Sequence, residues 1–186
     1  MKRILACVLF VASFTAPAAA DDVTDTIESA LQAYKDGDIP YAMEELQFAQ
    51  QLMQQMQAEG LVAFLPEAPE GWTREVNTEM NAGLAMMGGG AGAEAVYYSD
   101  NYSFTLTLMA DNPMVNAMSA MFGNSAMMAS MGKLVRVGRE KFVEQDGELT
   151  ALINNRVLVQ ASGDEIDAMI PILEMIDFKE LGQFGL

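Results

Sequence analysis

Methionine is the residue type in this sequence that is best suited to bind a ligand. The chain has 16 methionines among 186 residues. Three of them, Met114, Met118 and Met121, fall at i, i+4 and i+7, which places them on one face of a predicted helix. Thioethers are soft ligands that select Cu(I). This helix face is therefore a candidate Cu(I) site, with a role in binding or chaperoning the metal.

The same spacing has a second interpretation, in which these methionines are packing residues. Met is a flexible apolar side chain that fills irregular gaps, and any helix face that points to a core shows this spacing. Other methionines are scattered, for example Met86, Met87 and Met175, which favours general use of Met in place of Leu. The sequence leaves both interpretations open.

The methionine-rich segment is also unusual in its charge. The 21 residues from Asn112 to Gly132 carry no charged side chain, in a chain that is strongly acidic elsewhere. A second group of methionines, Met127, Met128 and Met131, lies in this segment. Since an uncharged, Met-rich surface adapts readily to a partner, these three are candidate interaction residues. The alternative is that the segment is the helix buried against a sheet.

Composition excludes several kinds of active site. The chain has no His, which rules out a Ser-His-Asp triad, a His-ligated zinc ion and a His-ligated haem. A hydrolase with two carboxylates needs only acidic residues, yet no pair among the 26 Asp and Glu stands out by its spacing. We therefore expect no enzyme activity, no catalytic residue and no cofactor, with Cu(I) as the alternative.

The first twenty residues have the pattern of a secretory signal peptide. Lys2-Arg3 precedes an apolar run over residues 4–14, and Ala18-Ala19-Ala20 supplies small residues for cleavage. Cleavage near Ala20 would remove Cys7, which is the only cysteine. The apolar run is too short to span a bilayer, and we expect no transmembrane span in the mature chain. The expected location is the periplasm or the secreted fraction.

Charge limits the partners that the chain can bind. The 26 acidic and 10 basic residues give a net charge of −16, which repels nucleic acid and anionic membranes. Four basic residues nevertheless gather within one short stretch: Lys133, Arg136, Arg139 and Lys141. They either hold an anionic ligand or pair with neighbouring acids such as Glu140 and Glu144. A protein in the cell envelope is the expected partner.

Helical periodicity predicts two helices at the start of the mature chain. The first covers 23–36 and has an apolar stripe of Ile27, Ala30, Leu31 and Tyr34. The second runs from Pro40 to about Ala58 and has Ala42, Leu46, Ala49 and Met53 on one face. Gly37-Asp38-Ile39, followed by Ala42, Leu46 and Ala49, resembles the G-D-Y-x-x-A-x-x-x-(Y/L)-x-x-A core of a tetratricopeptide repeat, with Ile39 in place of the aromatic. The resemblance implies a helical hairpin at 21–60. Because only one copy is present, it implies no peptide-binding groove.

A connector at 61–71 leads to a region with the alternating pattern of strands. Residues Phe104, Leu106 and Leu108 alternate with polar residues, which is typical of a half-buried antiparallel strand. Turn signals at Asp146-Gly147 and Asn154-Asn155 separate further strands. The sequence therefore predicts an α+β fold: an N-terminal helical hairpin, then at 72–186 an antiparallel sheet of about six to seven strands covered by two helices.

The predicted order of elements resembles the sheet-and-helix arrangement of PsbP-like periplasmic domains. It is also similar to uncharacterised secreted bacterial proteins in which a helical hairpin precedes Gly-Trp, here Gly71-Trp72. These observations together predict a non-catalytic periplasmic binding or protein-interaction module, with methionine-based Cu(I) binding as the alternative.

Overall fold

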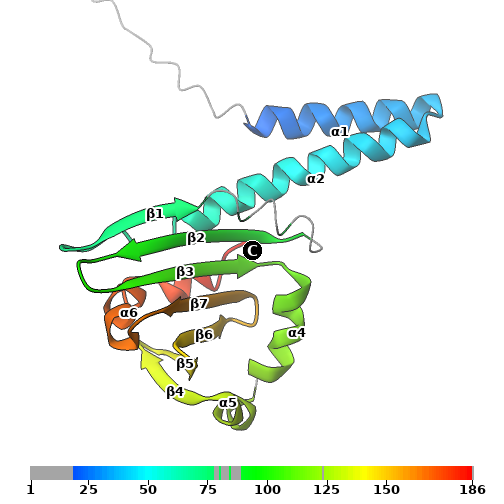
Figure 1. Ribbon diagram of the computed structural model, residues 1–186. Coiled ribbons are helices and arrows are strands. Elements are labelled where there is room, and N and C mark those ends of the chain that lie inside the picture. Colours follow the sequence, from blue (N-terminus) through cyan, green and yellow to red (C-terminus); the bar gives the residue numbers. More distant parts are fainter. Residues whose placement is uncertain (1–18, 78–79, 81–83, 85–88, 123, 186) are drawn as a thin grey trace, which may run out of the picture. The chain divides into compact units, whose positions relative to one another are not determined.

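The computed structural model describes residues 19–77, 80, 84, 89–122 and 124–185 (Figure 1). The chain divides into two compact units, one ending at Leu52 and the other beginning at Met53. The predicted signal peptide lies outside the described residues, except that Ala19 and Ala20 form the start of the first helix. Among the described residues, no helix is long and apolar enough to cross a membrane.

The predicted helical hairpin is confirmed; its first helix and the larger part of its second belong to the first unit. Helix α1 spans Ala19–Asp36 and helix α2 spans Ile39–Val62. Gly37, at φ 84°, allows the reversal between them. The Asp38 carboxylate then accepts a hydrogen bond from the backbone N–H of Tyr41 at 3.2 Å, so Asp38 caps the start of α2.

Within the first unit, the buried residues of the two helices are small. Ala30 and Ala33 of α1 and Ala42 and Ala49 of α2 are each at most 7% exposed. The large members of the predicted stripes are exposed instead: Ile27, Leu31 and Tyr34 on α1, and Leu46 and Met53 on α2. Each predicted stripe is therefore buried only at its alanines. The rest is exposed, because the stripe is wider than the surface that one neighbouring helix can cover.

In the described part of the second unit, seven strands form one antiparallel sheet in the order β1-β2-β3-β7-β6-β5-β4. The strands are β1 Thr73–Asn77, β2 Ala91–Tyr98, β3 Ser103–Ala110, β4 Lys133–Val137, β5 Glu140–Gln145, β6 Glu148–Ile153 and β7 Val157–Gly163. The helices that accompany them are α4 Pro113–Phe122, α5 Ser125–Met131, α6 Ile166–Leu173 and α7 Phe178–Leu181. The predicted α+β class is confirmed.

Both faces of the sheet bear helices. Alternate residues of the central strands, such as Leu106, Leu108 and Val159, form the main core with Met169 of α6 and Leu181 of α7. The residues between them point to the opposite face, where α4 and α5 lie against the sheet. The methionine-rich segment therefore forms two helices that cover one face of the sheet, whereas one helix was predicted. The short helix α7 was not predicted.

The two predicted turns have the backbone conformation that their sequences require. Asn154 and Asn155 have φ of 49° and 56°, and Asp146 and Gly147 have φ of 52° and 83°. Two consecutive left-handed residues define the type I′ turn, whose twist matches that of the flanking strands. These turns set the register in which β5, β6 and β7 pair.

Tyr97 ties the connector to the sheet. Its side chain is fully buried and stacks on Phe104, with the ring centroids 4.9 Å apart. Its hydroxyl donates a hydrogen bond to the Pro66 carbonyl at 2.6 Å, and the Arg74 guanidinium donates to the carbonyls of Leu65 and Pro66. The connector between α2 and β1 is thus held by side chains of both β1 and β2.

Tyr97→Phe should lower the free energy of unfolding by about 1 kcal/mol, because the Pro66 carbonyl would keep only its bond from Arg74. Tyr98→Phe is the matched control, since Tyr98 is 41% exposed on the same strand, and it should change stability by less than about 0.5 kcal/mol. Urea unfolding followed by circular dichroism measures both. Equal effects in the two variants would contradict a structural role for the Tyr97 hydroxyl.

Burial raises the pKa of Tyr97 from 10.0 to about 12. The unfolded chain therefore releases this proton at lower pH than the folded chain does, and stability falls as pH rises from 10 towards 12. In a titration of phenolate absorbance, Tyr97→Phe should remove the component that ionises last. A late component that persists in this variant would show that another tyrosine is responsible.

Candidate functional site

The uncharged segment folds into α4 and α5, which follow β3 and lead to β4 at the edge of the sheet (Figure 1). The Asn124 side chain accepts a hydrogen bond from the Ala126 backbone N–H at 2.9 Å, which caps α5. Beneath the helices lie two apolar clusters. One contains Met109, Val115 and Leu158, and the other contains Phe122, Met128 and Val143.

The three predicted Cu(I) ligands occupy different surroundings. Met118 is half-buried and packs against both apolar clusters, so its thioether serves the core. Met121 is 39% exposed, and the side chain of Met114 lies outside the described residues. The packing interpretation thus accounts for Met118, and a Cu(I) site made by the three residues stays a prediction.

The predicted interaction residues also divide by burial. Met128 is buried in the second apolar cluster, Met131 is half-buried against it, and Met127 is 48% exposed. Consecutive residues of a helix point about 100° apart, which is why Met127 and Met128 differ so sharply. Met127 is therefore the member of this group that an approaching protein would meet most directly.

Met128→Ala should destabilise the fold by about 2 kcal/mol, because it removes a buried side chain and leaves a cavity. Met127→Ala, one residue earlier in the same helix, should cost less than about 0.5 kcal/mol. Thermal or urea unfolding of the two variants provides the measurement. Similar losses in both would mean that the two side chains are not divided between core and surface.

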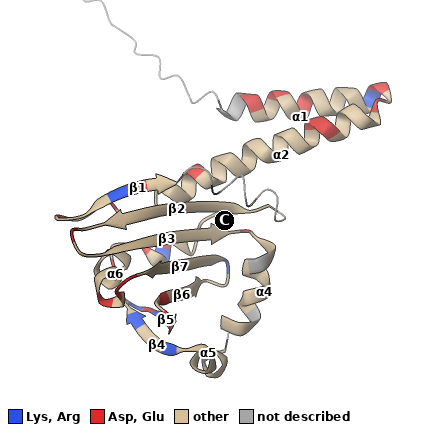
Figure 2. Cartoon of the chain, viewed as in Figure 1, with Lys and Arg blue, Asp and Glu red and all other residues tan. Residues whose placement is uncertain are grey.

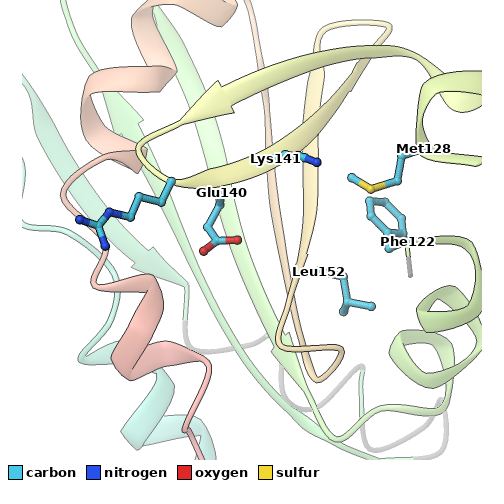
Figure 3. Close-up of a pocket in the computed structure, with 6 residues that line it drawn as sticks. Phe122, Met128, Glu140, Lys141 and Leu152 are labelled. Atoms are coloured by element: carbon cyan, nitrogen blue, oxygen red, sulfur yellow. The ribbon is translucent and has the colours of Figure 1, made fainter. Parts of the chain in front are cut away.

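A pocket of about 260 Å³ lies where this layer meets the tip of the β4–β5 hairpin. It is lined by Phe122, Met128, Leu152, Arg139, Glu140 and Lys141. Figure 3 shows Phe122 and Met128 side by side, with the Lys141 ammonium group directed towards them. The pocket therefore combines an apolar wall with one ammonium group directed towards it, and the neighbouring residues Arg139 and Glu140 complete its lining.

The basic stretch gives this corner of the sheet its charge. Lys and Arg mark β4 in Figure 2, and β4 is an edge strand. Lys133 pairs with Glu144, with Nζ and Oε2 3.0 Å apart, as one sequence interpretation expected. Arg136 instead faces Lys141 directly across the β4–β5 ladder, and like charges in such a pair repel. Within the described residues, neither forms an ion pair with a carboxylate.

Two half-buried carboxylates of the sheet, Glu94 and Glu148, are separated from each other. Glu94 of β2 and Glu148 of β6 lie on the same face, but β3 and β7 stand between them. Three strand spacings put them about 14 Å apart, which exceeds the separation of the two acids in a glycosidase. Among the described residues, no group of three or more acidic side chains is arranged to hold a metal ion.

Comparison of the chain with family models, with curated proteins and with solved structures gave no match. The protein has an α+β fold with an N-terminal helical hairpin, and a fold of this kind does not by itself identify a function.

Sequence reasoning pointed to the methionines and to the basic stretch but did not connect them. They line one pocket, and Leu152 and Phe122 complete its wall from β6 and α4. Phe122 carried a usable signal, because it lies four residues after Met118 on the same helix. Leu152 carried none, since strand alternation does not show which helix covers a strand.

Proposed function

We propose that this protein is a non-catalytic binding module of the cell envelope. In this proposal the pocket at the β4–β5 tip receives one apolar side chain of a protein segment that also carries carboxylates. The observation that carries it is one pocket whose lining includes the apolar residues Phe122, Met128 and Leu152 together with the basic residues Arg139 and Lys141. The location rests on the signal-like pattern of the first twenty residues.

The size of the pocket favours a side chain over a complete small molecule. Pockets that enclose small-molecule ligands usually have volumes of about 300–1,000 Å³. At about 260 Å³, this pocket is below that range. A single large side chain in a small pocket is the usual anchor of a protein interface. The partner is therefore better described as a protein segment than as a cofactor.

The charge of the pocket favours an acidic segment. Arg136 and Lys141 are both exposed and face each other across the β4–β5 ladder, and an anion between them would remove their repulsion. The chain as a whole has a net charge of −16, but charges further than about 8 Å are screened at physiological ionic strength. A docked carboxylate would therefore respond chiefly to the cations of this corner.

The methionine content suits such a site. Thioether side chains are flexible and polarisable, so the wall that Met128 provides can adjust to more than one apolar side chain. The neighbouring Met127 and Met121 are exposed on the same layer and would extend the contact surface. This accounts for a Met-rich segment that is free of charge without requiring a metal ion.

The proposal can be tested with labelled twelve-residue peptides in fluorescence polarisation. One peptide alternates Glu with Leu and Phe, and its matched partner has Lys in place of each Glu. We expect the acidic peptide to bind at least tenfold more tightly, with an affinity that falls as salt is added. Equal binding of the two peptides would contradict the proposal.

Charge reversal locates the binding site. The double variant Arg139→Glu/Lys141→Glu should weaken binding of the acidic peptide at least tenfold. The control Lys35→Glu/Lys179→Glu makes the same change in net charge at exposed positions of α1 and α7, and it should leave affinity within about twofold. An unaffected first variant, or an equal loss in both, would show that the pocket is not the site.

A further inference from the structure

The helical hairpin carries a large apolar surface that the fold does not use. Six residues, three on each helix, are between 43% and 65% exposed: Ile27, Leu31 and Tyr34 of α1, and Ile39, Met43 and Leu46 of α2. We call these six residues the hairpin apolar face. Scattered exposed apolar residues are ordinary on a protein surface, whereas a contiguous apolar patch marks an interaction site.

Helix geometry shows that the six residues are contiguous. Each set of three has the spacing i, i+4, i+7, which makes one stripe along a helix. On each helix the stripe lies to the same rotational side of the buried alanines, Ala30 on α1 and Ala42 on α2. Because the two helices run in opposite directions, both stripes then face the same side of the hairpin.

The two stripes also lie at similar positions along the axis of the hairpin. Residues at similar distances from the turn at Gly37-Asp38, within two residues, lie beside one another, because the chain reverses its direction there. The face therefore consists of three layers, which stack along the hairpin: Tyr34 with Ile39, Leu31 with Met43, and Ile27 with Leu46. None of the six side chains is charged.

The opposite side of the hairpin differs in chemistry. The same rotation places Asp25, Ser29 and Asp36 of α1 on that side, beside Tyr41 and Phe48 of α2. The acidic residues there oppose close contact with another acidic chain. The hairpin apolar face, by contrast, can approach a second surface without bringing charges of one sign together.

We propose that the hairpin apolar face is the contact surface of a symmetric dimer of this chain. An isologous two-fold interface uses the same patch on both partners. A second copy therefore presents three uncharged apolar layers of the same length, and the four helices together bury all twelve side chains. The face has no charged group with which to recognise a charged partner, which favours the copy as its occupant.

The available area is sufficient for such a dimer. Helix α1 has 18 residues and is about 27 Å long at 1.5 Å per residue, and two adjacent helices are about 20 Å wide. The apolar layers occupy about 12 Å of this length, from Ile27 to Tyr34, and a contact along the whole of α1 covers about 500 Å² of each copy, or about 1,000 Å² in total, which reaches the lower limit for a specific interface. Since the hairpin and the peptide pocket are separate surfaces, this inference does not depend on the proposed function.

The test compares two residues of α2 that are equally exposed. Leu46 and Phe48 are each 51% exposed and lie on opposite sides of the hairpin. Sedimentation equilibrium of the complete exported protein should show a dimer. Leu46→Glu should weaken dimerisation at least a hundredfold, because it buries an unpaired charge, while Phe48→Glu should leave it within about threefold.

Circular dichroism checks that each variant is folded. If Leu46→Glu does not fold, Leu31→Glu provides the same test from α1, where Leu31 is also 51% exposed. A wild-type chain that stays monomeric at about 100 µM overturns the proposal. So does a Leu46→Glu or Leu31→Glu variant that still forms the dimer, or a Phe48→Glu variant that is equally impaired.

The same samples distinguish other occupants of the face. A monomer that floats with phosphatidylcholine vesicles, and loses this property in Leu46→Glu, would identify a lipid surface as the occupant. A monomer in which Leu46→Glu lowers the free energy of unfolding far more than Phe48→Glu would show that the chain covers the face itself. Either result overturns the dimer.

Discussion

The pairing of β3 with β7 is the interaction on which the rest of the second unit depends. These strands join β1-β2-β3 to β7-β6-β5-β4, and their register places Leu106 opposite Ala161 and Leu108 opposite Val159. This continuity creates one apolar face broad enough for α6 and α7. The chain between these two neighbouring strands, which comprises α4, α5, β4, β5 and β6, is therefore a long insertion. The pocket lies in that insertion.

The path of this insertion explains why the methionine-rich helices lie near the basic residues. The chain leaves the sheet centre at β3 and must reach the edge at β4, so α4 and α5 cross the face in between. An edge strand is protected from pairing with other chains by charged side chains, and Lys133 and Arg136 meet that need. Protection of the edge by Lys133 and Arg136 is compatible with the proposed recognition of an acidic partner by the neighbouring Arg139 and Lys141.

The elements with strong local signals were predictable, and the contacts between them were not. Alternation around Leu106 and the Asn154-Asn155 turn depend on nearest neighbours, and both appear as expected. Periodicity in the hairpin predicted apolar stripes but not which part is covered, since Ala30 and Leu31 look equivalent until the second helix is placed. Likewise, spacing put Met118 among metal ligands, whereas its burial depends on strands far along the chain.

The hydrogen bonds that Tyr97 and Arg74 donate to the connector around Pro66 have a consequence for resistance to proteolysis. A stretch with two prolines between a helix and a strand has the composition of an exposed linker, and proteases cleave linkers that can adapt to their active sites. Here Tyr97 and Arg74 occupy the carbonyls of Leu65 and Pro66. A protease would have to break these bonds before the backbone could enter its cleft. We therefore expect the segment that joins α2 to β1 to resist cleavage better than its composition suggests.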